Sequence, residues 1–304
     1  MSIRTQQGVA LVMVLLVVAI ATTLATFIAQ QQGFWQRAME NGRDRAQARR
    51  IAEAGIDWAR AVLADDASAS QVDHGREMWA LRLPAIPVEG GEVQGIITDQ
   101  QGLFNLNNLV QNGVASMQDV TRFQRLLVAL GLPPQLSGAL VDWMDTDSEV
   151  SVNGAEDGFY MSLAKPYRCA NRPLSDIGEL AWIKGYDAHI IRRLQPFVSV
   201  LPESNTKVNV NFAPAEVLMA ILPGLALQDA RALVTRITSS PFNTTADFLQ
   251  QLPGNVPREE SMLSVHSQYF LVTGYATQKD GASAVYALLR RNGIWPTQIR
   301  KSLQ

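Results

Sequence analysis

The chain has little of the chemistry that marks disulfide scaffolds, zinc sites or polyanion-binding proteins. It holds one cysteine in 304 residues, Cys169, which excludes an intrachain disulfide. Its three histidines, His74, His189 and His266, are scattered and form no zinc-ligand motif. Lys and Arg number 26 against 28 Asp and Glu, a net charge of −2. Nothing in this balance calls for a nucleic-acid partner.

Catalytic signatures are missing as well. The sequence has no glycine-flanked serine elbow, no HExxH and no phosphate loop. Asp142 with Asp145 as paired carboxylates, or Ser264 with His266 as nucleophile and base, are the enzymatic alternatives. Neither pair has the basic or aromatic partners that would define a substrate site. We therefore predict that the protein is not an enzyme.

The N-terminus contains a long apolar run. Residues 9–28, VALVMVLLVVAIATTLATFI, include no charge, glycine or proline. Twenty helical residues are about 30 Å long, which matches the hydrocarbon core of a bilayer, and few soluble helices are apolar on every face. We predict a transmembrane helix over residues 9–29. Arg4 precedes it, which favours a cytoplasmic N-terminus and a translocated C-terminal domain.

After this span the sequence becomes amphipathic. Between Gln30 and Asp65 small and apolar residues recur at steps of three and four, and charged residues such as Asp44 and Arg45 fall on other faces. The predicted helix should pack this stripe on a globular head and end in a turn over residues 67–75. The stripe consists of Ala48, Ile51, Ala52, Gly55, Trp58, Ala59 and Val62.

Strand patterns lie on both sides of a long helical region. Residues 78–88 and 92–98 form one predicted pair, and residues 268–277 and 282–290 form another, each with a glycine-containing turn. We predict an α+β fold in which the long N-terminal helix packs on a small antiparallel sheet. The head would comprise residues 30–109 and 261–304, with an all-α domain, residues 110–260, inserted between strands.

The predicted insertion contains a degenerate repeat. RLLVALGLPPQLSGALVDWMD and VLMAILPGLALQDARALVTRI each read as two helices joined by a glycine turn, and a proline-led helix follows each. Such pairs resemble helix-hairpin-helix modules, so a membrane-anchored DNA receptor is the alternative function. However, no Lys or Arg is adjacent in sequence to either turn, as phosphate binding would require.

The first repeat copy carries an extra acidic segment. It holds no Lys or Arg among its acidic residues, and its oxygen-bearing side chains surround glycine-permitted turns. Hard oxygen ligands on a flexible loop suit Ca²⁺, although the EF-hand register is absent and a solvated acidic loop fits the same residues. The acidic residues are Asp142, Asp145, Asp147, Glu149, Glu156 and Asp157.

Several segments together resemble one family. A glycine, in QQG, stands directly before the apolar run, as in proteins with a type IV prepilin-like leader. The other segments are QGLFNLNNL, DWMDTDSEVSVNGAEDGFY, KPYRCANRPLSDIGEL and LPESNTKVNVNFAPAEVL. Jointly they resemble the K-type minor pseudopilins of the type II secretion system.

The resemblance implies a processed N-terminus. A prepilin peptidase would cut after Gly8, remove residues 1–8 as the leader and leave Val9 as the first mature residue, and methylation is implied with it. Most type IV pilin-like proteins carry glutamate as the fifth mature residue, where this chain has Met13. The K-type pseudopilin is known for lacking that glutamate and for its place at the filament tip.

The resemblance also implies a fold, a cofactor and partners. The fold would be a pilin-like head with a large helical insertion. Structural calcium would bind the insertion through Asp145, Asp147, Glu156 and Asp157, with Asp142 as a further candidate. The single-pass inner-membrane protein would join I- and J-type minor pseudopilins, without nucleic acid. Their tip complex would initiate the periplasmic pseudopilus and support export of folded proteins across the outer membrane.

Overall fold

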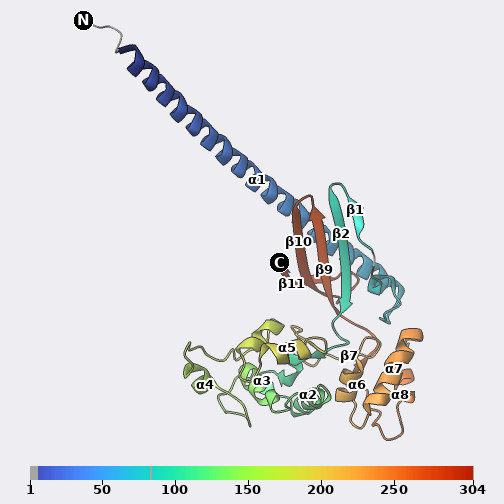
Figure 1. Ribbon diagram of the computed structural model, residues 1–304. Coiled ribbons are helices and arrows are strands. Elements are labelled where there is room, and N and C mark those ends of the chain that lie inside the picture. The colour runs from blue at the N-terminus through green and yellow to red at the C-terminus, as the bar shows by residue number, and fades with distance from the viewer. Residues whose placement is uncertain (1–5, 83, 304) are drawn as a thin grey trace.

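The computed structural model describes residues 6–82 and 84–303, so the first five residues of the predicted leader lie outside the described residues. The chain begins with one helix, α1, Gln6–Ala69. Its 64 residues correspond to roughly 96 Å of helix. Figure 1 shows that its first half projects away from the molecule, while its second half lies against a sheet. The helix runs past Ala67, where a turn was predicted.

The sheet has five antiparallel strands in the order β1-β2-β9-β10-β11. Their bounds are β1 Ile86–Val88, β2 Gly91–Asp99, β9 Tyr269–Gln278, β10 Gly281–Arg290 and β11 Thr297–Leu303. The predicted strand over 78–88 is wrong in its first part, which forms the 3₁₀ turn η2, Met78–Ala80. The edge strand β11 was not predicted. Because β2 and β9 are direct neighbours, the insertion leaves and re-enters the head at adjacent strands.

Small residues bring α1 close to the sheet. A Cβ added at Gly274 would lie 2.5 Å from the carbonyl oxygen of Ala52, and one at Gly281 would lie 2.6 Å from the backbone nitrogen of Arg45. The buried stripe of α1 includes Ile56, whereas Trp58, which was predicted to lie on it, is 47% exposed. Asp44, predicted for an outer face, is buried under the β9–β10 turn. Because α1 packs tightly on these glycines, the set of side chains that faces the sheet differs from the predicted set.

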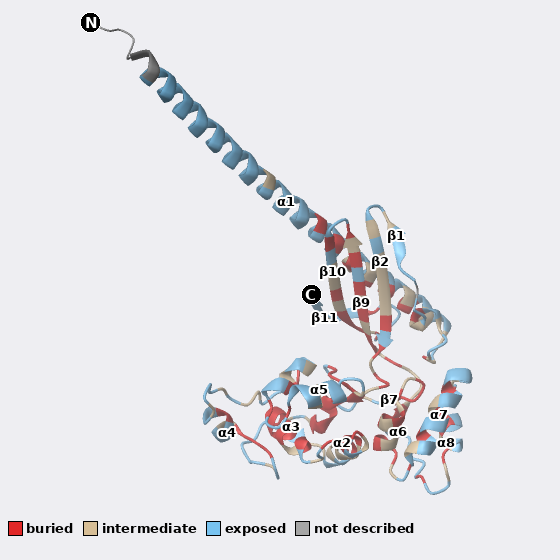
Figure 2. Ribbon diagram, in the orientation of Figure 1, coloured by how far each residue is buried: buried red, intermediate tan, exposed pale blue. Residues whose placement is uncertain are grey.

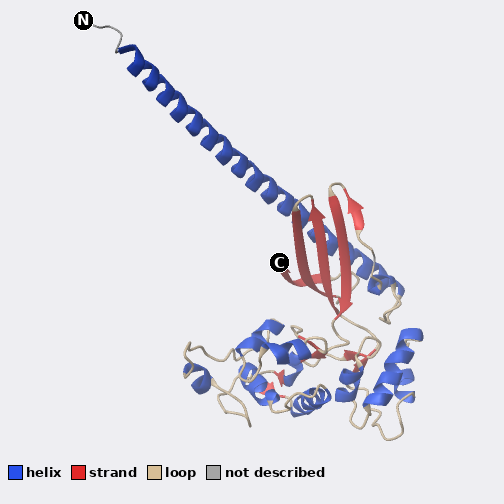
Figure 3. Ribbon diagram, in the orientation of Figure 1, coloured by secondary structure: helices blue, strands red, loops and turns tan. Residues whose placement is uncertain are grey.

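The regular elements of the insertion are mainly helices, joined by long loops (Figure 3). Its helices are α2 Met117–Ala129, α3 Leu136–Met144, α4 Asp157–Met161, η4 Ile177–Trp182, α5 Ala188–Leu194, α6 Ala215–Ile221, α7 Leu227–Ser239 and α8 Thr245–Gln250. The short elements are β3 Phe104–Asn105, η3 Leu106–Leu109, β4 Val110–Gln111, β5 Val114–Ala115, β6 Val198–Ser199, β7 Val208–Asn209 and β8 Leu263–Ser264. Both repeat copies form the predicted helix pairs, and each turn contains a left-handed glycine: Gly131 has φ 63° and Gly224 has φ 84°.

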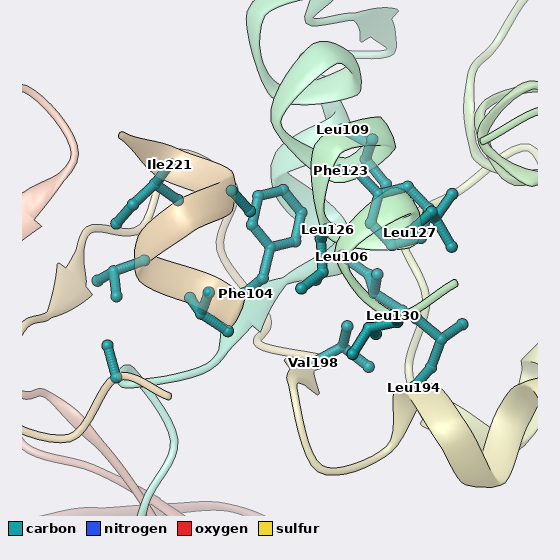
Figure 4. Close-up of a cluster of buried hydrophobic side chains, with 14 of the residues drawn as sticks. Phe104, Leu106, Leu109, Phe123, Leu126, Leu127, Leu130, Leu194, Val198 and Ile221 are labelled. Atoms are coloured by element: carbon teal, nitrogen blue, oxygen red, sulfur yellow. The ribbon is translucent and has the colours of Figure 1, made fainter. Parts of the chain in front are cut away.

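One apolar core joins the two repeat copies. Phe104 and Phe123 stack with ring centroids 5.8 Å apart, and α6 packs beside α2 around them (Figure 4). In Figure 2 this core is separate from the one between α1 and the sheet. Since Phe104 and Leu106 belong to the insertion core, the insertion begins earlier than the predicted residue 110.

Buried polar side chains fasten the insertion to the head. The Arg291 guanidinium contacts both carboxylate oxygens of Asp73 at 2.6 Å, and Asp73 also accepts a hydrogen bond from the Ser267 backbone at 2.6 Å. Asn209 donates to the Ser267 hydroxyl at 2.8 Å. These bonds connect the segment after α1, the end of the sheet and the returning chain. Because buried polar groups require partners, the network fixes how the two parts meet.

Candidate functional site

The acidic loop brings three carboxylates together. Asp145 follows α3, Asp147 lies two residues later, and Glu156 precedes α4. One carboxylate oxygen from each lies within 4.8 Å of the other two. Asp145 and Glu156 are buried, whereas Asp147 is exposed to solvent. The arrangement offers hard oxygen ligands from both ends of the loop with an open side.

Two buried oxygens of this group lack a hydrogen-bond partner within the described chain. Asp145 Oδ1 and Glu156 Oε1 are buried without a hydrogen-bond partner among the described residues. Burial, and after it the charge of Asp147, raises the pKa of Asp145 to about 7. Burial likewise raises the pKa of Glu156. Unpaired buried carboxylates are costly unless a cation or proton neutralises them, so this donor set fits a divalent cation such as Ca²⁺.

The structure gives the other two predicted ligands different partners. Both carboxylate oxygens of Asp142 accept from the Ser151 backbone, at 3.2 and 3.1 Å, and Gly154 packs directly on this carboxylate. Asp157 accepts from the Cys169 backbone at 2.9 Å and lies 3.8 Å from the Arg168 guanidinium. Asp142 and Asp157 therefore shape the loop, and the three-carboxylate group forms without them.

An aromatic cluster behind the loop was missed from the sequence. The ring of Tyr160 lies 5.2 Å from those of Trp143 and Tyr167, and the Tyr167 ring lies 5.5 Å from that of Trp182. Lys184 Nζ donates to the Gly154 carbonyl at 2.9 Å. The Trp and Tyr residues that flank the acidic residues in the sequence could have predicted this cluster. These rings pack against the loop on its core side, and the lysine binds the turn that contains Gly154.

A second acidic group does not have the same character. Asp66, Asp73 and Glu77 also lie within ligand distance of one another. Here Arg291 is paired with two of the three carboxylates, because it contacts Asp66 at 2.9 Å and Asp73 at 2.6 Å. Burial opposes ionisation of Asp73, but the hydrogen bond with His266 and the charge of Arg291 hold its pKa below the ordinary value. This group is an internal ion-pair network.

The N-terminal half of α1 has the length and composition of a membrane span. Its most apolar window has a mean hydropathy of 2.7, and none of that window is buried within the protein. Gly8, Val9 and Met13 all lie in the first turns of α1. The side chain of Met13 is apolar and exposed.

These features define a class of protein. The long N-terminal helix on an antiparallel sheet is the pilin-like α+β architecture, and here it carries a helical insertion with a cation-suited acidic loop. Two sequence families, both described as type II secretion system (T2SS), protein K, match residues 102–203 and 208–266.

Full-length relatives and a solved structure agree with the family matches. The chain is 33% identical to type II secretion system protein K of Klebsiella pneumoniae, over 95% of this chain and 93% of that protein. It is 35% identical to the protein of the same description from Pseudomonas aeruginosa, over 95% and 90%. One chain in the crystal structure of the GspK-GspI-GspJ complex from enterotoxigenic Escherichia coli superposes with a TM-score of 0.78, at 25% identity over 88% of this chain and 99% of that chain. The chain belongs to the type II secretion system protein K family, and the resemblance and fold class predicted from its sequence are confirmed.

Proposed function

We propose that this protein is the minor pseudopilin at the tip of a periplasmic pseudopilus, where it joins I- and J-type subunits and initiates assembly. It acts by assembly and without catalysis, in support of the export of folded proteins across the outer membrane. The main support is the similarity along nearly the whole chain to a structure solved as a complex with GspI and GspJ.

The shape of the molecule supports a tip position. The exposed half of α1 is free to pack with the helices of neighbouring subunits, while the insertion lies at the opposite end of the molecule (Figure 1). A bulky insertion at that end obstructs addition of a further subunit above it. Met13 supplies no carboxylate for the amino terminus of such a neighbour, because its side chain is apolar.

The same proposal places α1 in the inner membrane. Residues 9–29 span the bilayer once, with a cytoplasmic N-terminus and the remainder in the periplasm. Prepilin peptidase removes residues 1–8, and Val9 becomes the first mature residue.

Intact mass and N-terminal sequencing after co-expression with prepilin peptidase test the processing. We expect a terminus at Val9, and an uncut chain in the Gly8→Ala variant. An uncut wild-type chain contradicts the processing step. Co-purification of the processed chain with its I- and J-type partners tests the assembly role. Processed chain that purifies without either partner contradicts the tip complex.

We further propose that Ca²⁺ binds the acidic loop through Asp145, Asp147 and Glu156. The unpartnered buried oxygens of Asp145 and Glu156 support this assignment. A bound calcium ion would offset most of the negative charge of the group. Asp142 and the glycine turn hold the loop in register, and Asp145 and Glu156 would tie the ends of α3 and α4 to the ion.

A further inference from the structure

A groove of about 400 Å³ lies between α2 and the turn that follows α6. Arg122 and Arg125 of α2 line one wall, and Ile221 and Pro223 line the other. Met117, at the start of α2, is 72% exposed at one end. Figure 4 shows α6, with Ile221 at its end, facing α2 across the insertion core. The groove is therefore apolar on one side and carries two guanidinium groups on the other.

Most of the donors on these two arginines have no partner within the protein. Arg122 is buried and donates from Nη1 to Asp119 at 2.8 Å, which leaves Nε and Nη2 without a protein acceptor among the described residues. Arg125 donates from Nε to the Ala220 carbonyl at 2.7 Å, which likewise leaves Nη1 and Nη2. None of these four nitrogens is enclosed out of contact with solvent. Each therefore keeps some contact with solvent, and both arginines line the groove.

The carboxylates nearby do not neutralise both arginines. Asp119 also accepts from the Gln111 side chain at 3.0 Å and the Ser116 hydroxyl at 2.7 Å. Glu259, on the rim, accepts from the Ser261 hydroxyl, and no ion pair joins it to either arginine in the described chain. Burial and the charge of Arg122 lower the pKa of Arg125. Arg125 is therefore repelled by its neighbour without an offsetting anion.

We propose that this groove binds a carboxylate carried on an apolar peptide segment of a neighbouring protein. The planar fork of arginine matches the two oxygens of a carboxylate, and paired forks favour one anion between them. The walls formed by Met117, Ile221 and Pro223 suit an aliphatic side chain next to that carboxylate. The apolar wall favours a peptide over a free phosphate, which has no apolar part to bury.

Titration calorimetry of the full-length protein in detergent micelles tests this site. The probe is N-acetyl-leucyl-glutamate, with its neutral bis-amide and inorganic phosphate as comparisons. We expect the bis-amide to bind at least ten times more weakly than the dipeptide. Arg125→Gln should weaken dipeptide binding at least tenfold, whereas Arg231→Gln, an exposed arginine of α7, should leave it unchanged.

Arg122→Lys provides a second variant. It retains a cation beside Asp119 but removes the free donors at Nε and Nη2, so it should weaken dipeptide binding severalfold. A thermal melt of each variant separates lost binding from lost folding. Equal binding of the dipeptide and bis-amide, or wild-type affinity in both Arg122→Lys and Arg125→Gln, overturns the site. Phosphate that binds more tightly than the dipeptide overturns its assignment to a peptide.

Discussion

Calcium should stabilise the wild-type protein and have little effect on a variant without one of its proposed ligands. In the calcium-free protein, Asp145, Asp147 and Glu156 hold carboxylate oxygens within 4.8 Å of one another. At an effective dielectric constant of about 20, two unit charges at that distance repel by about 3 kcal/mol. Asp145→Asn removes one charge from the group. The variant should therefore melt at a higher temperature than the wild type when both are free of calcium.

With calcium the wild type should recover most of this difference. A ligand present at 100 times its Kd stabilises the folded state by about 2.7 kcal/mol. For a chain of 304 residues, with an unfolding entropy of roughly 2.1 cal/mol/K per residue, that corresponds to a rise of about 4 °C in Tm. The wild type should show this rise between EGTA and excess calcium, and Asp145→Asn should lose most of it. Asp57→Asn, the same exchange on the exposed face of α1, should respond like the wild type.

Scanning fluorimetry of the full-length chain in detergent, at pH 7.5 in EGTA or in calcium, measures both effects. An unchanged wild-type Tm in the two buffers would refute the metal site. A variant that responds to calcium as strongly as the wild type would refute Asp145 as a ligand.

The remaining predictions concern the head and its junction with the insertion. Burial raises the pKa of Asp99 from 3.8 to about 7, so the folded state binds this proton more tightly than the unfolded state. The contribution of this proton to the free energy of unfolding is complete below about pH 4 and is lost as the pH rises through 7. Urea denaturation of Asp99→Asn should therefore give a free energy of unfolding that changes less between pH 5 and 8 than that of the wild type. Arg291→Met leaves buried Asp73 without its cation and should lower the free energy of unfolding by about 3–5 kcal/mol, measured by urea denaturation; an unchanged midpoint would contradict the ion-pair assignment. Gly274→Ala places a Cβ 2.5 Å from an α1 carbonyl and should cost roughly 1–3 kcal/mol in the same assay, whereas Gly95→Ala, with open space around its Cβ, should cost far less.

Much of the fold was predictable because local periodicity carries it. The apolar run, the amphipathic continuation and the alternating strands around two glycine turns predicted a long helix, a small sheet and a helical insertion. Periodicity in the sequence indicates which residues can be buried, but tertiary packing decides how far each of them is buried. Trp58 matched the apolar spacing, yet the close approach of α1 to Gly274 and Gly281 buries Ile56 instead. The strand β11 was missed because its residues, TQIRKSL, lack a clear apolar alternation.

The acidic loop shows the same division between composition and geometry. The clustered acidic residues suited either a cation or a solvated loop, and the family resemblance favoured calcium. The sequence set Asp142 apart as a further candidate but grouped Asp157 with Asp145, Asp147 and Glu156. The backbone amides of Ser151 and Cys169 bind Asp142 and Asp157 only after the chain has folded.

By itself the sequence determined the apolar N-terminal helix, the α+β class, the helical repeat and the family, because each depends on local pattern or on motifs contiguous in the chain. The tertiary structure decided which carboxylates meet, how Arg291 joins the head to the insertion, and where cations face the second hairpin turn. The sequence around that turn has no adjacent Lys or Arg, yet α2 brings Arg122 and Arg125 to it from about 100 residues away. Contacts between distant segments depend on how helices pack, and spacing along the chain does not encode them directly.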